Sequence, residues 1–190
     1  MTVVENNISL IRMDIKNYQE FLVREATDSI IVYVEPAIAR RFFTEINQQV
    51  MQEKIGESLS IERFLITACL LLEFPCLLGG MIVSIFALKW YSIIAILIMV
   101  GAFFILGATS SMGKQRIRGA ILLLIVCALL AYYLRDKGIF MTLWLILLPL
   151  PYFFTRLKYK LATMFLYSLV IHNEKAFNLL NGKGILLKER

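Results

Sequence analysis

Long apolar stretches, separated by short charged segments, dominate the middle of this chain from residue 64 to residue 155. A helix needs about 20 largely apolar residues to cross a hydrocarbon core ~30 Å thick. We therefore predict an all-α membrane protein, with a transmembrane domain at 61–155 that begins at a Ser60 cap. The four predicted transmembrane helices cover about 64–88, 92–108, 119–134 and 139–155.

Residues 1–60 have a different pattern, with apolar residues every three or four positions. This spacing is typical of amphipathic helices, and we predict two of them in a cytoplasmic region, the second ending at Gly56. The β-branched segment 29–34 forms either a short strand or more helix. The apolar stripes cover the protein itself or bind a partner protein. The stripes are Ile8, Ile11, Ile15, Tyr18 and Leu22, then Ile38, Phe42, Ile46 and Val50.

The C-terminal region 156–190 is basic and amphipathic. Its apolar run 161–171 is too short to cross a bilayer, so we predict a separate cytoplasmic or interfacial helix over 156–181, ended by Asn181 and Gly182. The tail 184–188 is short and extended, and it could pair with 29–34 if both are strands. One face of the helix would hold Leu166, Leu169, Val170, Asn173, Phe177 and Leu180.

The formal net charge of +6 is unevenly distributed, because residues 1–60 carry six basic and nine acidic side chains and the rest carry fourteen and five. Seven basic residues flank the spans on the side of the N-terminus and three flank the other side, which predicts cytoplasmic termini at a bacterial inner membrane. No basic stripe indicates nucleic-acid binding. The candidates for contact with lipid or a partner are Lys114, Arg116, Arg118, Arg156, Lys158 and Lys160.

Glu73 is the one acidic residue deep inside a predicted span, roughly 15 Å along the helix from Arg63. Intramembrane ionisable groups are costly and are candidates for function. Pro75 removes a helix hydrogen bond nearby, so Glu73 and Pro75 are our candidate functional pair. No basic residue lies in the middle of another predicted span, so an isolated Glu73 would be protonated. It would serve as a structural hydrogen-bonding group or in transport or gating.

Small residues lie on one face of the second and third predicted spans, where they allow helices to approach closely. The three cysteines lie in apolar runs and the chain has a single histidine, so we expect packing cysteines and neither a metal site nor a disulfide framework. The candidate helix-packing residues are Ser92, Ala95, Ala102, Ala120, Cys127 and Ala131.

The sequence contains no paired carboxylates in a span, no glycine-rich phosphate loop and no metal-ligand spacing. We therefore expect neither an enzyme nor a cofactor. Our first hypothesis is a multi-pass membrane protein that binds another membrane or membrane-associated protein, as an accessory subunit or an immunity or exclusion factor. The alternative is a small transporter or pore subunit that self-associates and uses Glu73.

Overall fold

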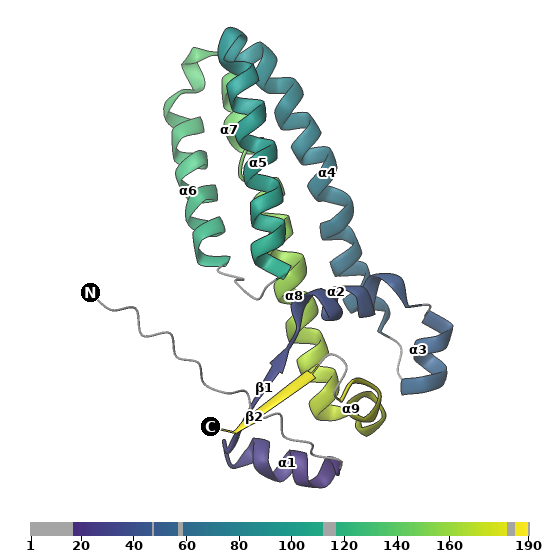
Figure 1. Ribbon diagram of the computed structural model, residues 1–190. Helices are drawn as coiled ribbons and strands as arrows, with labels where there is room; N and C mark the ends of the chain where they lie inside the picture. Colours follow the sequence, from purple (N-terminus) through teal and green to yellow (C-terminus); the bar gives the residue numbers. More distant parts are fainter. Residues whose placement is uncertain (1–16, 47, 57–58, 112–116, 182–184, 190) are drawn as a thin grey trace, which may run out of the picture.

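The computed structural model describes residues 17–46, 48–56, 59–111, 117–181 and 185–189. It has two parts, a bundle of apolar helices and a smaller cap at one end of that bundle (Figure 1). Helix α8 belongs to both, since it starts inside the bundle and runs on into the cap. The prediction of a mainly α-helical chain is confirmed.

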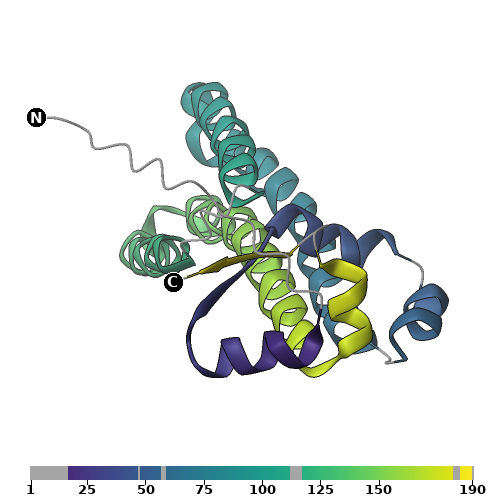
Figure 2. The same cartoon turned by 60° about the horizontal axis from the view of Figure 1, so that its bottom comes forward.

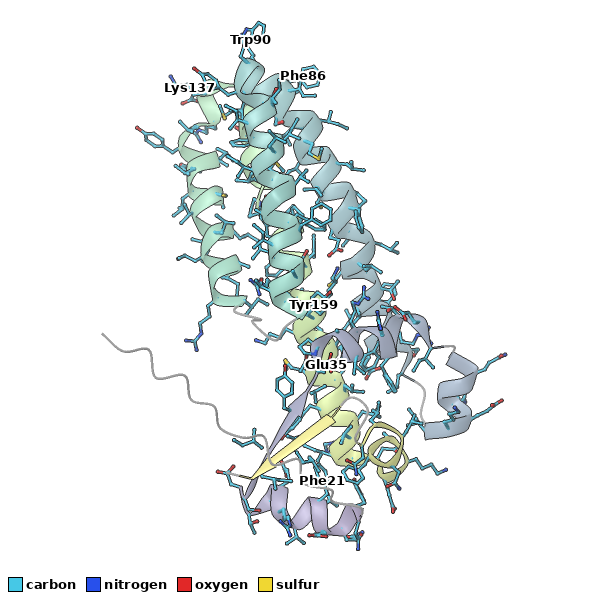
Figure 3. All side chains as sticks on the ribbon, in the orientation of Figure 1. Phe21, Glu35, Phe86, Trp90, Lys137 and Tyr159 are labelled. Atoms are coloured by element: carbon cyan, nitrogen blue, oxygen red, sulfur yellow. The ribbon has the colours of Figure 1, made fainter. Side chains whose placement is uncertain are left out.

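The bundle consists of helices that alternate in direction along its long axis (Figure 1). Two 3₁₀ turns connect helices at the end remote from the cap, and Trp90 and Lys137 lie there (Figure 3). The elements are α4 (Ser60–Leu88), η1 (Lys89–Tyr91), α5 (Ser92–Ser111), α6 (Ile117–Tyr133), η2 (Arg135–Lys137), α7 (Ile139–Leu147) and α8 (Leu150–His172).

Two stretches are long and apolar enough to cross a membrane, Ser60–Ser110 and Ile139–His172, and α6 is a shorter apolar helix. The first stretch folds back on itself at η1, so α4 and α5 lie side by side (Figure 1). Large apolar side chains cover the outside of these helices, among them Phe64, Phe104 and Leu129. A surface of this kind is typical of lipid contact.

The cap is built from both ends of the described chain around the second half of α8. Figure 2, with the cap forward, shows α1, α9 and the strands grouped there. The strands β1 and β2 pair antiparallel, with Ile30 opposite Glu189 and Val34 opposite Ile185, which confirms the predicted pairing of segment 29–34 with the tail. The elements are α1 (Tyr18–Ala26), β1 (Ile30–Val34), α2 (Pro36–Glu45), α3 (Gln48–Ile55), α9 (Glu174–Leu180) and β2 (Ile185–Glu189).

An aromatic cluster fixes α1 against α9 and α8. Phe21 and Phe177 are fully buried with ring centroids 4.7 Å apart, and Tyr18 lies 5.6 Å from Phe177. The Tyr18 hydroxyl donates a hydrogen bond to the Ile171 carbonyl. Burial, with the Glu174 carboxylate nearby, raises the pKa of Tyr18, so this hydroxyl keeps the proton that it donates.

Helix α8 corrects the predicted boundary at residue 156. We expected a span ending at residue 155 and a separate helix after it, but α8 is continuous from Leu150 to His172. The interruption lies earlier, between α7 and α8, where Pro149 and Pro151 stand. The helix after these prolines carries the chain out of the bundle without a break.

The N-terminal boundaries differ in detail from the prediction. The second amphipathic helix is divided into α2 and α3, and Gly56 follows α3 with φ of +83°, which confirms it as the stop. Ser60 is the first residue of α4, not its cap. The α4 helix also continues through Pro75. The first predicted stripe falls mostly outside the described residues.

We predict that Phe177→Ala will destabilise the cap by about 3–5 kcal/mol, the usual cost of truncating a buried Phe. Limited proteolysis of the detergent-solubilised protein should show faster cleavage within α1 and α9. Val23→Ala, at a position 63% exposed on α1, is the matched control and should leave the pattern unchanged. Equal protection of all three proteins would show that the aromatic cluster does not hold the cap together.

Candidate functional site: a buried ion pair between α4 and α8

Glu73 is paired with a lysine. The Lys158 ammonium donates a hydrogen bond to Oε1 of Glu73 and forms a salt bridge with it. The two residues are only 2% and 5% exposed. The expectation that Glu73 has no basic partner is therefore wrong, because Lys158 lies on the inward face of a helix that we had placed outside the membrane domain.

Thr155 completes this site from the helix that carries Lys158. Its hydroxyl lies 3.2 Å from Oε2 of Glu73 and 2.8 Å from the Pro151 carbonyl one turn earlier. Thr155 and Lys158 are three positions apart, so both project from one face of α8 toward α4. Both carboxylate oxygens of Glu73 thus have a partner on the same neighbouring helix.

The pair is enclosed by other side chains of the protein. Cys69, one turn before Glu73, is buried, and the Lys158 ammonium lies 5.5 Å from the centre of the Tyr159 ring. Figure 3 places Tyr159 at the junction of bundle and cap. In such an environment an unpaired charge is expensive, whereas an ion pair with its hydrogen bonds made is tolerated. The pair therefore favours the one arrangement of α4 and α8 that keeps both charges matched.

Side chains on a different face of α8 from Thr155 and Lys158 form hydrogen bonds with α5. The Tyr152 hydroxyl donates to the Met99 carbonyl at 3.2 Å, and Nη2 of Arg156 donates to Oγ1 of Thr109 at 3.1 Å. Tyr152 and Arg156 are four residues apart, one turn of helix. The first turns of α8 are thus connected by polar bonds to α4 on one side and to α5 on the other.

The predicted small-residue faces point into the bundle. Ser92, Cys127 and Ala131 are buried, and Ala95, Ala102 and Ala120 are half-buried. The Ser92 hydroxyl donates to the Lys89 carbonyl at 2.6 Å, so it closes the turn between α4 and α5. The residues around Cys127 and Ala131 on α6 are exposed, which shows how narrow the buried face of that helix is.

The basic candidates for lipid or partner contact fall into three groups. Arg156 and Lys158 are buried inside the protein, in contrast to the expected surface position. Arg118 is exposed and Lys160 half-buried. Lys114 and Arg116 lie outside the described residues.

Sequence reasoning missed Lys158, Thr155 and Tyr152 as partners. A signal was present, because the buried residues of α8 recur every three or four positions: Tyr152, Thr155, Tyr159, Ala162, Leu166 and Leu169. This stripe crosses residue 156 without interruption. Following it would have predicted one helix and placed Lys158 beside Thr155 on the inward face.

Within the described ranges, no three or more His, Cys, Asp and Glu side chains gather as a metal ion would require. The comparisons with protein-family models, with curated proteins and with solved structures found no match to this chain. Its function is therefore argued from its geometry.

We predict that removing one partner of the ion pair will destabilise the protein strongly. Glu73→Leu and Lys158→Met each leave one buried charge unmatched, and this costs about 3–5 kcal/mol. The double variant removes both charges and should recover most of that loss. The free energy of unfolding, measured in mixed micelles with increasing denaturing detergent, tests this coupling.

Lys160→Met is the control for this experiment, since Lys160 is half-buried on the same helix and has no described salt bridge. It should unfold like the wild type. Single variants as stable as the wild type would contradict a structural role for the pair. So would a double variant that is less stable than either single one.

Proposed function

We propose that this chain is an integral membrane protein with four spans that docks another membrane or membrane-associated protein through its cap. The spans are α4, α5, α6, and α7 continued by the first turns of α8. Support comes from the apolar outer surface of these helices and from aromatic residues at the end remote from the cap. Trp90, Tyr132 and Tyr133 are 91%, 70% and 80% exposed there, which is typical of a membrane interface.

The proposed orientation places the cap in the cytoplasm of a bacterial cell. Few basic residues lie at the remote end, namely Lys89, Arg135 and Lys137, and the larger number at the cap end follows the positive-inside pattern. The strands β1 and β2 pair within the cap although they lie on either side of the bundle in sequence. The two strands can pair only if they lie on the same side of the membrane, and this requires an even number of membrane crossings between them.

This placement puts the Glu73–Lys158 pair inside the hydrocarbon region. Glu73 is fifteen residues before the end of α4 at Leu88, or roughly 22 Å along a helix. A core ~30 Å thick that starts at the remote end then includes Glu73 in the third nearest the cap. The ion pair would secure α8 at the level where it leaves the membrane for the cap.

The observation that carries the docking proposal is an apolar groove between β1 and α8. It has a volume of about 250 Å³ and is lined by Val32, Tyr33, Val34, Pro36, Thr163, Met164 and Tyr167. Tyr33, Met164 and Tyr167 are 43%, 53% and 36% exposed. Neighbouring strand residues point to opposite faces, so a groove lined by three successive ones follows the edge of β1.

The edge of β1 that faces this groove is available to a further strand. Among the described residues, the backbone of Ile30–Val34 has no hydrogen bond outside its pairing with β2. Glu25 bonds to Tyr167 at 3.0 Å and Glu35 follows Val34 directly, so carboxylates flank the groove. We therefore propose that the groove binds an extended segment of a partner protein. This segment has apolar side chains and basic flanks, and it binds by strand addition to β1.

The biological role that fits this arrangement is non-enzymatic, as an accessory subunit or an immunity or exclusion factor. The alternative, a self-associating transporter that uses Glu73, has less support. Both oxygens of that carboxylate are engaged by Lys158 and Thr155, and Glu73 is 2% exposed. A transport role would need this pair to open.

We predict that reporter fusions will place the position after residue 190 on the opposite side of the membrane from positions 90 and 136. A fluorescent protein fused after residue 190 should be fluorescent in the cytoplasm, and a phosphatase inserted at 90 or 136 should be active outside it. The reason is the even number of crossings. An active phosphatase after residue 190 would overturn the four-span arrangement.

A second prediction tests the groove directly. A photo-crosslinking amino acid at Met164, activated in cells, should join a segment of another protein with apolar and basic residues, identified by peptide mass spectrometry. The same amino acid at Val23, which is exposed on α1 away from the groove, is the matched control. Tyr33→Asp should abolish the Met164 product because it places a charge in the groove.

Two outcomes would contradict docking at this groove. One is a Met164 product that contains residues 1–16 of this chain, since the groove would then be filled from within. The other is a Met164 product that Tyr33→Asp leaves unchanged, or that also forms from Val23.

A further inference from the structure

Arg63 lies at the cap end of α4, three residues after the helix begins at Ser60. Its side chain is half-buried, and its Nη1 atom is buried without a hydrogen-bond partner among the described residues. The salt bridges within the described ranges do not include it. A buried N–H group that has lost its hydration is costly unless it gains an acceptor. Arg63 therefore calls for an acceptor from outside the described chain.

A second arginine, Arg40 on α2, shows the same feature. Its Nε atom is also buried with no hydrogen-bond partner in the part of the chain that the structure describes. Its Nη2 atom lies 3.7 Å from Oε1 of Glu45, which is longer than a hydrogen bond. The same oxygen lies 3.9 Å from Nε of Arg41. One carboxylate is thus shared by two guanidinium groups, and α2 keeps an unbalanced positive charge.

The two arginines border one apolar core at the place where α2 crosses the lower end of α4 (Figure 1). Ile66 and Phe43 are both fully buried and belong to this core. Arg63 is three positions before Ile66 in α4, and Arg40 stands in the same relation to Phe43 in α2. Residues at this spacing share a helix face, so both arginines project toward the junction of α2 and α4. The charge of Arg40 also acts on Lys158 of α8, which lies behind this junction.

The level of Arg63 agrees with the head-group layer of the proposed membrane. Arg63 is twenty-five residues before the end of α4 at Leu88, or roughly 38 Å along a helix. Measured from that remote end, the hydrocarbon core ends after ~30 Å and the head groups occupy roughly the next 5–7 Å. An arginine side chain is long enough to bring its guanidinium into that layer. On the same turns of α4, Ile61 and Phe64 are each 70% exposed, which suits contact with lipid.

We propose that the phosphate of an anionic phospholipid binds where α2 crosses α4, against the guanidinium groups of Arg63 and Arg40. The planar fork of N–H donors on each arginine matches phosphate oxygens. The anion also balances the charge of this junction, since these two arginines and Arg41 exceed the acids Glu45 and Glu62 by one. A free phosphate would use the same cations but would leave the exposed apolar side chains beside them uncovered.

A phosphate held by both helices would fix α2, and with it the cap, against the surface of the membrane. The proposal rests on the membrane placement proposed above. It is independent of the docking groove, which is lined by β1, the start of α2 and the later turns of α8.

The experiment measures lipid retention by the full-length protein. Protein purified in a mild detergent is titrated with phosphatidylglycerol or with phosphatidylcholine and examined by native mass spectrometry. The wild type should retain phosphatidylglycerol in preference to phosphatidylcholine by about tenfold or more, the range of a single charge-assisted hydrogen bond. Arg63→Gln should remove this preference. Arg63→Lys keeps the charge without the fork and should retain part of it.

Arg135→Gln is the matched control. Arg135 is exposed at the remote end of the bundle, so this variant loses the same charge without changing the site, and it should retain phosphatidylglycerol like the wild type. Arg40→Gln tests the site from the other helix and should also lower the preference. It decides the matter if Arg63→Gln does not fold.

Three results would overturn the proposal: equal retention of the two lipids by the wild type, an unchanged preference in Arg63→Gln or Arg40→Gln, or an equal loss in Arg135→Gln. Displacement of the lipid by millimolar inorganic phosphate would assign the site to the free anion. Recovery of the wild type in the soluble fraction of cells would instead refute the membrane placement. A wild type that fractionates with membranes but has no lipid preference refutes the lipid site alone.

Discussion

The need to match two buried charges determines how the bundle and the cap are joined. Glu73 on α4 and Lys158 on α8 are both nearly inaccessible to solvent. Each is the counter-charge of the other, so neither is an isolated charge in an apolar medium. Sliding α8 by one turn along α4 would separate the charges by about 5 Å. The pair thus sets the register between the two helices, which apolar contacts alone would leave less well defined.

That register also determines where the cap sits, because α8 is the common element of both parts. Its first turns bond to α4 and α5, and its later turns carry Leu166, Leu169 and Val170 into the core of the cap. Phe21, Phe43 and Phe177 join the same core from three other helices. A displacement of α8 in the bundle would therefore move the cap and the groove beside β1 together, which links the membrane part to the proposed docking surface.

The sequence predicted local features well and the central contact poorly. The spacing of apolar residues located the helices. The β-branched segment 29–34 and the tail were recognised as possible paired strands. Both signals can be read from residues that are close together in the sequence. The Glu73–Lys158 contact joins residues 85 positions apart, and charge alone does not reveal it. The basic residues Arg156, Lys158 and Lys160 led us to end the span at residue 155, which turned Lys158 into a surface residue. Counting residues along the helices from the two turns at the remote end would have placed Glu73 and Lys158 at a similar depth in the bundle.

The two cations on α8 illustrate how neighbouring positions on one helix meet different requirements. Lys158 faces α4 and finds a carboxylate there, which makes a neutral unit that the bundle can enclose. Arg156, two residues earlier, points away from Lys158 by about 200° around the helix axis and lines a cavity between α5 and α6. The two cations therefore connect α8 to different helices: Lys158 meets the Glu73 carboxylate of α4, and Arg156 meets the Thr109 hydroxyl of α5.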